Sequence, residues 1–388
     1  MRPLPAGLIQ QPQADAFLES VRRSARAAAR GTLSIFGGSG EDAADTTARN
    51  VPALLFTGPE GTGREYTAIE FARSLCCERE TACDPGTDDV CSSCLQMSLL
   101  EHPGLHLIYP TPTQGSSEGD DGDITDIAKI LDEKRQDVFA KYRFSKKASI
   151  RVARARATIQ QAAGKPFESP YDIFVFNDAH AMREGAQNAL LKLVEEPAPH
   201  VVVIFTTSNP EGILYTIRSR CQRIRFLPLA TEGIENILTS YYDADAKTAR
   251  RAAAMAQGSI VRAREMVESF DDSERDAAAA FVAGLTKEGE SWAIGQALLM
   301  GRGANREGVG RFLDEVSLIF RDIMTGDPEL HVNRDLSKQL EKLAAHWPQA
   351  QLPGVIDRFA RARGDILLGN AAIDAALADC FLEVHRRR

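Results

Sequence analysis

The sequence predicts an α/β domain with a parallel sheet, followed by all-α domains. Up to about residue 228, short apolar runs typical of buried strands alternate with segments of helical periodicity, and this alternation predicts a parallel sheet with crossover helices. Residues 229–388 are rich in Ala, Leu, Glu and Arg, keep helical spacing and contain few strand-like runs. At roughly 100–200 residues per domain, a chain of 388 residues predicts two or three domains.

The elements of the α/β part follow from the apolar pattern and from the residues that end it. Ala53–Thr57 (ALLFT) is an apolar run that ends in a glycine-rich turn, and Tyr66–Cys76 continues with helical spacing. Asp172–Phe176 (DIFVF) and Val201–Thr206 are further strand candidates. Between these two, Gly185–Glu196 has apolar residues at i, i+3 and i+4 and stops before a proline, which predicts a helix.

Two polar segments interrupt this pattern. Gly37–Asn50 (GGSGEDAADTTARN) and Thr111–Asp123 (TPTQGSSEGDDGD) are rich in Gly, Ser, Thr and Asp. Such segments have few groups to bury. We expect both to be solvated loops, and an acidic site for a metal or a basic partner in the second is the less favoured alternative.

The charge balance argues against a protein that coats nucleic acid by itself. Lys and Arg number 46 against 54 Asp and Glu, giving a net charge of −8, whereas nucleic-acid-binding domains usually carry a basic surface. Contact with DNA should therefore be local or made through partners. The N-terminus lacks the apolar stretch of a signal peptide, and the strongest apolar run (Val201–Phe205) is far shorter than a membrane span. A soluble, cytoplasmic protein without membrane contact is expected.

The segment GPEGTGRE, at residues 58–65, follows the first predicted strand and resembles a phosphate-binding loop. Gly58, Gly61 and Gly63 occupy positions that such a loop needs. The usual lysine is replaced by Arg64, whose planar fork does not reproduce a compact ammonium. The hydroxyl residue that binds Mg²⁺ is replaced by Glu65, whose carboxylate would repel a triphosphate. The loop is therefore predicted to keep its backbone turn and to have lost ATP hydrolysis, which leaves ATP binding in doubt.

A second acidic position is altered in the same direction. The strand DIFVF runs into Asn177 and Asp178, where a working site would place Asp and Glu to hold Mg²⁺ and to polarise water. Asn177 is neutral, and Asp178 is one methylene shorter than Glu. The alternative that both residues cap the next helix is compatible with a lost catalytic role.

Five of the seven cysteines lie close together in the sequence. They are Cys76, Cys77, Cys83, Cys91 and Cys94, and the last two form a C-x₂-C pair. In a reducing compartment such a cluster suggests metal before disulfide, and four thiolates can close a tetrahedral structural zinc site. Reduced thiols without metal are the alternative. A redox role is less favoured because the strand–CxxC–helix context is missing.

Three more segments carry a resemblance to a known family. They read NALLKLVEEP (188–197), VIFTT (203–207) and TIRSRC (216–221). With the altered loops, they make residues 8–228 similar to the bacterial DNA polymerase III clamp-loader subunits of the AAA+ class. The delta-prime type is closer than the tau/gamma ATPase, because its nucleotide site is typically degenerate. The resemblance also implies an arginine in the lid of the ATPase type, where this chain has Val261.

This resemblance implies a division of the chain and a set of site residues. Residues 1–228 would form an AAA+ P-loop-like domain with a zinc module, residues 229–272 a helical lid, and residues 273–388 a helical collar. The Ser-Arg-Cys motif of the family falls on residues 219–221 and makes Arg220 the arginine finger. In the family this arginine reaches the γ-phosphate of ATP bound to a neighbour, where such a group can raise the rate by about 10³–10⁵. The alternative for Arg220 is a structural salt bridge.

The resemblance also selects the zinc ligands. The family's Leu-x-Cys ending of the preceding helix favours Cys77 over Cys76, so the implied ligands are Cys77, Cys83, Cys91 and Cys94. The loop between the second and third ligands is longer than the usual C-x₂-C. In the collar, an apolar stripe on Arg311–Met324 would pack against other subunits or form internal core; it comprises Phe312, Val316, Ile319, Phe320 and Ile323.

The favoured function is therefore a non-hydrolysing, delta-prime-like clamp-loader subunit. Its partners would be tau/gamma ATPase subunits and a delta subunit, with the sliding clamp and primed DNA reached through the complex. The first alternative is a divergent tau/gamma-like ATPase that uses Arg64 and Asp178 in unusual roles. A stand-alone DNA-binding protein is the weaker alternative, because the chain is acidic.

Overall fold

The structure of the chain is a computed structural model. It describes residues 9–29, 51–79, 83–84, 87, 89–112, 121–142, 148–166, 168–269, 272–302, 305–328, 330–367, 369 and 371–388. The chain divides into two compact units. The first, here called the sheet unit, is Met1–Gly233 with Gly258–Arg262, and the second, the helical unit, is Ile234–Gln257 with Ala263–Arg388. The division into three domains at residues 228 and 272 stays a prediction.

A five-stranded parallel sheet with the order β2-β5-β6-β1-β7 organises the sheet unit. Its strands are β1 (Leu54–Thr57), β2 (Leu105–Ile108), β5 (Asp172–Phe176), β6 (Val201–Thr207) and β7 (Gln222–Arg225). Every residue of the three central strands, β5, β6 and β1, is buried. Strands covered on both faces need apolar side chains in both directions, which explains their unbroken apolar runs.

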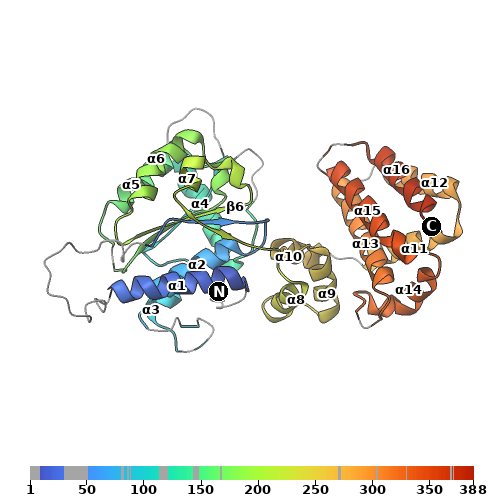
Figure 1. Cartoon of the computed structure of the whole chain (residues 1–388), viewed down its shortest axis with the longest axis horizontal. Helices are drawn as coiled ribbons and strands as arrows, with labels where there is room; N and C mark the ends of the chain where they lie inside the picture. The colour runs from blue at the N-terminus through green and yellow to red at the C-terminus, as the bar shows by residue number, and fades with distance from the viewer. Residues whose placement is uncertain are drawn as a thin grey trace. The chain divides into compact units, whose positions relative to one another are not determined.

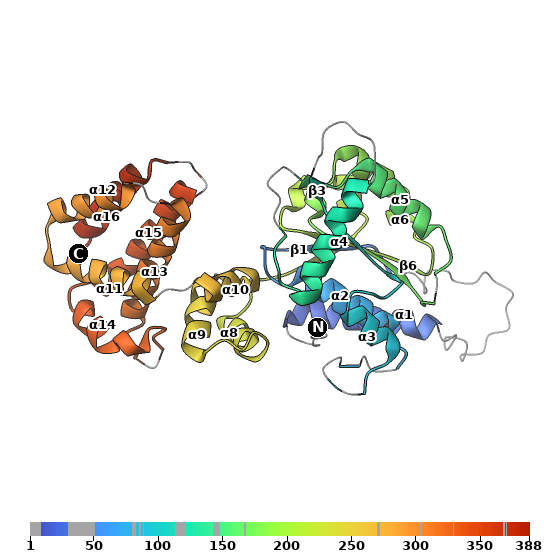
Figure 2. The ribbon, with the colours of Figure 1, turned by 180° about the vertical axis from the view of Figure 1, so that it is seen from behind.

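Helices cover both faces of this sheet (Figure 1). On one face lie α1 (Pro12–Ala29), α2 (Arg64–Cys76) and α3 (Ser92–Ser98); on the other lie α5 (Val152–Ala162), α6 (Glu184–Glu195) and α7 (Tyr215–Arg218). Alternate residues of β1 enter the two cores, since Leu54 and Phe56 pack toward α2 and Leu55 packs toward α6. Figure 2 shows the two layers from behind, together with α4 (Asp121–Gln136), which adds Ile130 to the core of α2.

Minor elements fill the connections. The strands β3 (Thr111–Pro112) and β4 (Ala148–Ser149) pair antiparallel, and short 3₁₀ helices lie at Ala179–Ala181 (η3) and Pro210–Gly212 (η4). The loop prediction for Thr111–Asp123 is wrong at both ends, because Thr111 and Pro112 pair with β4 and α4 begins at Asp121. Residues 113–120 and the other predicted loop, residues 37–50, lie outside the described residues.

The elements after β7 are helical, as the sequence predicts. They are α8 (Thr231–Ser240), α9 (Ala246–Met255), α10 (Ile260–Ser269), α11 (Asp272–Lys287), α12 (Glu290–Gly301), α13 (Arg306–Thr325), α14 (Ser337–Ala344), α15 (Leu352–Leu367) and α16 (Ile373–Arg386), with 3₁₀ turns η5 (Arg334–Leu336) and η6 (Gln349–Gln351). The longest, α13, has local start and stop signals. The Asn305 side chain accepts a hydrogen bond from the Glu307 amide at 3.0 Å, and Gly326 ends the helix at φ 69°.

The apolar stripe of α13 lies inside the helical unit. Val316, Ile319, Phe320 and Ile323 are at most 1% exposed and belong to one core cluster, against which Phe312 packs partly buried. Within that cluster, the Phe320 ring lies 4.8 Å from that of Trp347. The stripe is therefore internal core, the second of the two alternatives that the sequence left open.

Candidate functional sites

The carboxyl ends of four neighbouring strands meet at one edge of the sheet. After β1 comes the glycine loop; after β5 come Asn177 and Asp178; after β2 comes Tyr109; and β6 ends at Thr207. Hydrogen bonds tie these ends together: the Gly58 amide donates to the Thr207 carbonyl at 3.3 Å, and the Asn177 amide donates to the Ile108 carbonyl at 2.8 Å. Ligands of open parallel sheets bind at this edge.

Three glycines shape the loop, because a side chain at each of them would collide with a neighbouring residue. A Cβ at Gly58 would lie 2.4 Å from the Phe226 carbonyl oxygen. Gly61 has φ 78° and faces Ser259, which a Cβ would approach to 1.9 Å, and Gly63 has φ 85° at the start of α2. These conformations favour glycine, so the loop keeps a backbone turn that could cradle an anion.

Two buried side chains beside the loop, Arg64 and Asn177, each have an N–H group without a hydrogen-bond acceptor among the described residues. Arg64 is 7% exposed and its Nη1 has no hydrogen-bond partner among the described residues. Burial lowers the pKa of Arg64, and the nearby carboxylates of Asp178 and Glu60 oppose that shift. Asn177 is 2% exposed; its Oδ1 accepts from the Thr206 hydroxyl at 3.2 Å, while its Nδ2 finds no partner in the described structure.

The acidic side chains of Glu65 and Asp178 are engaged by other residues of the chain. The Glu65 carboxylate accepts hydrogen bonds from the Tyr109 hydroxyl and, at 2.7 Å, from the Lys134 ammonium. The Asp178 carboxylate accepts from the Tyr142 hydroxyl. Burial, reinforced by the neighbouring carboxylates, raises the pKa of both tyrosines well above its usual value. Both phenols therefore stay protonated and act as donors.

Glu65, Lys134, Tyr142 and Asp178 border a cavity of about 90 Å³. It has room for a few water molecules, since one water molecule needs roughly 10–15 Å³ of cavity volume. Of the residues predicted for a nucleotide site, Gly61, Gly63, Arg64, Asn177 and Asp178 line this cavity, and Gly58 does not. Additional lining comes from Lys134, Tyr142 and Ile260, which sequence reasoning missed, and from Val261, the lid position that the resemblance singled out.

Asp178 does not cap the helix that follows it. It stands at the N-cap position of η3 with φ 45°, and its side chain makes no capping hydrogen bond. Its carboxylate instead faces Tyr142. The capping alternative is therefore wrong for Asp178, and a residue other than glycine in this region of φ is uncommon outside turns and functional sites.

Arg220 lies between α7 and β7, outside this cavity. Its side chain is 40% exposed, and its Nε lies 2.5 Å from Glu195 Oε1, at the end of α6. Its Nη1 donates to the Thr216 carbonyl at 2.9 Å. The sequence alternative of a salt bridge is thus present, but the pair is at the surface, where such pairs contribute only about 0–1 kcal/mol.

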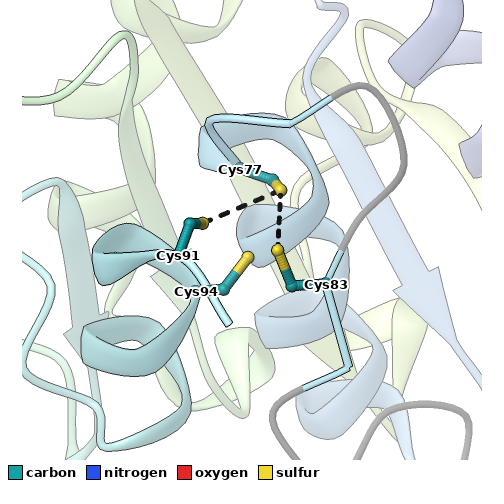
Figure 3. Close-up of side chains that lie close together, drawn as sticks. All are labelled: Cys77, Cys83, Cys91 and Cys94. Carbon is teal, nitrogen blue, oxygen red and sulfur yellow. Dashed lines mark hydrogen bonds between the residues drawn. The ribbon is translucent and has the colours of Figure 1, made fainter. Parts of the chain in front are cut away.

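The structure brings together Cys77, Cys83, Cys91 and Cys94 (Figure 3). All four are buried, and their sulfurs lie within 4.8 Å of one another. The Cys77 sulfur is 3.7 Å from that of Cys83 and 3.9 Å from that of Cys91. A tetrahedral Zn–S₄ centre with bonds of about 2.3 Å has S–S edges of roughly 3.8 Å, so the cluster has the dimensions of a zinc site.

Cys76 and Cys77 differ in environment although they are adjacent. Burial raises the pKa of Cys76 to about 12, and its thiol lies 3.6 Å from the Ser169 hydroxyl, outside the cluster. At Cys77, burial is outweighed by hydrogen bonds from the backbone amides of Arg79 and Cys83, which lower the pKa to about 7. The Cys77 sulfur lies within the cluster and the Cys76 sulfur lies outside it, so Cys77 is placed as a ligand and Cys76 is not.

Comparisons with known proteins show similarity to subunits of DNA polymerase III. A family model described as DNA polymerase III, delta subunit, matches residues 43–230. DNA polymerase III subunit delta' of Bacillus subtilis is 25% identical over 309 residues, covering 78% of this chain and 82% of that protein. Over most of its length, the chain is therefore similar to the delta' subunits of DNA polymerase III. Subunit delta' of Pseudomonas aeruginosa is 24% identical over 220 residues, covering 56% of each chain.

Similarity also extends to the gamma/tau subunits and to distant folds. Subunit gamma/tau of Mycobacterium tuberculosis is 29% identical over 181 residues, which span 46% of this chain and only 25% of that protein. A gamma subunit-related protein of Thermotoga maritima aligns over 97% of this chain and 99% of its own at 11% identity, with a TM-score of 0.36. RuvB of the same organism covers 88% and 89% at 12% identity, with a TM-score of 0.40.

Within the described residues, every helix is too short or too polar to span a bilayer.

Proposed function

We propose that this chain is the non-hydrolysing, delta-prime-like subunit of a DNA polymerase III clamp loader, and that it supplies Arg220 in trans to a neighbouring ATPase subunit. Its partners are tau/gamma subunits and a delta subunit in the cytoplasm. The sliding clamp and primed DNA are contacted through the complex, which suits an acidic chain with a net charge of −8.

The single observation that best supports the loss of hydrolysis is the fixed position of Glu65. In a working loop, a hydroxyl at this position binds Mg²⁺ beside the phosphates. Here a carboxylate takes that position, and its two oxygens bind Tyr109 and Lys134. A triphosphate would have to displace these donors and approach a negative charge.

The other parts of a hydrolytic site are also missing at this edge of the sheet. Asn177 is neutral and cannot replace an acidic Mg²⁺ ligand, and Asp178 is bound to Tyr142. Val261, at the position where the tau/gamma type would carry an arginine, adds an apolar side chain to the cavity lining. The pocket therefore lacks the lid arginine that would stabilise the developing γ-phosphate charge in the tau/gamma type.

Arg220 has the access that action in trans requires. Its guanidinium is partly exposed, and its partner Glu195 is 43% exposed, so releasing the pair costs about 1 kcal/mol or less. An arginine that stabilises phosphoryl transfer contributes about 4–7 kcal/mol, from a rate effect of about 10³–10⁵. The transition-state stabilisation that Arg220 would give at a neighbour's ATP therefore exceeds the free energy lost when it separates from Glu195.

A structural zinc ion bound by Cys77, Cys83, Cys91 and Cys94 completes the proposal. When bound, the metal would cross-link the end of α2 to the start of α3 and has no part in ATP chemistry. The cysteines fit it by number, burial and sulfur spacing.

The test begins with the isolated chain and a fluorescent ATP analogue in the presence of Mg²⁺, followed by a turnover assay. We expect no turnover. In the reconstituted complex, Arg220→Ala should lower turnover at the neighbouring site by about 10³-fold or more. The ATP turnover that remains in the complex then comes from the ATP sites that Arg220 does not contact.

Two further variants make this test specific. Arg220→Lys keeps the charge without the planar fork and should restore little activity. Arg223→Ala removes an exposed arginine of β7 and should leave turnover unchanged. Turnover by the isolated chain would favour a divergent ATPase. If the complex that carries Arg220→Ala keeps the turnover of the unaltered complex, the role of Arg220 as an arginine finger is refuted.

A further inference from the structure

A buried arginine lies against the cysteine cluster. Arg73, on α2, is 4% exposed, and its Nη1 is 3.9 Å from the sulfur of Cys94. The same Nη1 donates a hydrogen bond to the backbone carbonyl of Cys83. One guanidinium therefore reaches two of the four cysteines, one through its sulfur and the other through its backbone.

Glu70 fixes the orientation of this guanidinium. It stands one turn earlier on α2, and its carboxylate accepts from Arg73 Nε at 3.0 Å and from Nη2 at 2.8 Å. Such a two-point contact holds the plane of the guanidinium. Because Nε and Nη2 face Glu70, Nη1 is the nitrogen that reaches the cysteines.

The negative charge of a zinc-loaded cluster would explain why Arg73 lies beside it. Four thiolates and one Zn²⁺ sum to −2, a charge that is costly to bury without compensating donors. Arginine stays protonated in proteins and is weakly hydrated for a cation, so it suits such a buried position. Glu70 neutralises part of its charge, but the hydrogens of Nη1 point to the sulfur side.

We propose that Arg73 is a positioning residue of the metal site: it compensates the charge on the Cys94 sulfur and holds Cys83 in place through its carbonyl. This inference rests on the proposed zinc site and is independent of Arg220. Groups just outside a metal's ligands typically contribute 10–100-fold to its affinity.

The experiment uses the full chain, freed of metal with a chelator under reducing conditions, and titrated with Co²⁺ and then with Zn²⁺ in competition. Arg73→Met should weaken Zn²⁺ binding by about 10–100-fold. It should also move the thiolate-to-cobalt charge-transfer band to lower energy, because a sulfur that loses a nearby cation gives up an electron more readily. A purely structural role for Arg73 would not move this band.

Conservative variants keep the proposal testable if Arg73→Met fails to fold. Arg73→Lys keeps a cation and should recover part of the affinity and of the band position. Glu70→Gln retains Arg73 but weakens its orientation, and should give a smaller loss than Arg73→Met. Arg156→Met, an exposed arginine of α5 on the opposite face of the sheet, is the matched control and should behave as the unaltered chain does.

The outcomes separate the two proposals. If the unaltered chain binds neither Co²⁺ nor Zn²⁺ through its thiols, the zinc site and the role of Arg73 are both refuted. If it binds both metals and the folded Arg73 variants match it in affinity and spectrum, only the role of Arg73 is refuted. Neither result bears on Arg220, whose readout is ATP turnover in the complex.

Discussion

Lys134 and Glu65 form an ion pair within the sheet unit that joins α4 to the start of α2. The Lys134 side chain is 7% exposed and that of Glu65 is 19% exposed, and the ammonium also donates to the Val138 carbonyl at 3.1 Å. A pair this deep is only weakly screened by solvent, so removing one partner leaves an uncompensated charge. The pair both fixes the Glu65 carboxylate beside the glycine loop and holds two elements together.

Lys134→Met is therefore expected to destabilise the sheet unit by about 3 kcal/mol, at the low end of the usual range for a broken buried pair because Glu65 keeps Tyr109. The double variant Glu65→Gln, Lys134→Met should recover most of this loss. Unfolding in urea followed by circular dichroism measures both effects. Fluorescence of Trp292 and Trp347, the two tryptophans of the chain, reports on the helical unit as an internal reference. Equal losses in the single and double variants would contradict this account.

Adjacent cysteines provide a second comparison between single residues. We expect Cys77→Ala to lose most of its bound zinc and Cys76→Ala to keep about one zinc per chain, because only Cys77 points into the cluster. Metal analysis of both purified variants tests this. Removal of zinc from the unaltered chain by a chelator should reproduce the effect of Cys77→Ala on stability. Zinc retained by Cys77→Ala and lost by Cys76→Ala would reverse the assignment.

Among the elements, those with strong local patterns were predicted best. The strand Asp172–Phe176 matches β5, and the predicted helix at residues 185–196 lies one residue from α6. Thr111–Pro112 was missed as a strand because two residues carry no periodicity, and its pairing partner lies far along the chain at Ala148–Ser149. Strand β7 was missed because QRIR is a polar edge strand, whose exposed arginines suit an edge and hide its apolar signal.

The candidate site also shows that residues with a local sequence pattern are predicted, whereas residues brought together only by the fold are not. The glycine loop, Asn177 and Asp178 were found because each directly follows an apolar strand. Tyr109, Lys134 and Tyr142 lie 44, 69 and 77 residues after Glu65, and only the folded chain brings their side chains to it or to Asp178. Nothing in their local sequence marks them. Arg73 falls in a predicted helix, but its contact with Cys94 depends on the return of the chain through α3.

The burial of α13 leads to a prediction at the scale of elements. Phe320→Ala should destabilise the helical unit by about 3–5 kcal/mol, since the ring is fully buried and stacks near Trp347 and Phe359. Leu299→Ala on α12 is the matched control, because that side chain is 66% exposed and its loss should cost less than about 0.5 kcal/mol. Tryptophan fluorescence in urea measures both variants. Similar costs for the two would show that the α13 stripe is not the core.

At the scale of the whole molecule, the side chains of the sheet unit are those that bear on the proposed function. In the sheet unit, the Glu65 and Asp178 carboxylates beside the glycine loop are bound by other side chains of the same unit. Its exposed arginine, Arg220, is held by a partner that costs little to release. Under the proposed function, such a subunit would act on a neighbour's ATP without a cycle of its own, as expected at the end of a ring or arc of subunits.

The net charge of −8 adds a last prediction, about nucleic acid. The isolated chain should show no appreciable binding to primed DNA at about 0.15 M salt, because affinity for DNA comes largely from phosphate neutralisation by clustered basic side chains. Fluorescence anisotropy of labelled primed DNA measures this across a salt series. The reconstituted complex with its ATPase subunits should bind, with log K falling linearly against log salt. Steep salt-dependent binding by the isolated chain would instead identify a DNA-binding surface of its own, and the arginines of β7, Arg223 and Arg225, would be the first to substitute.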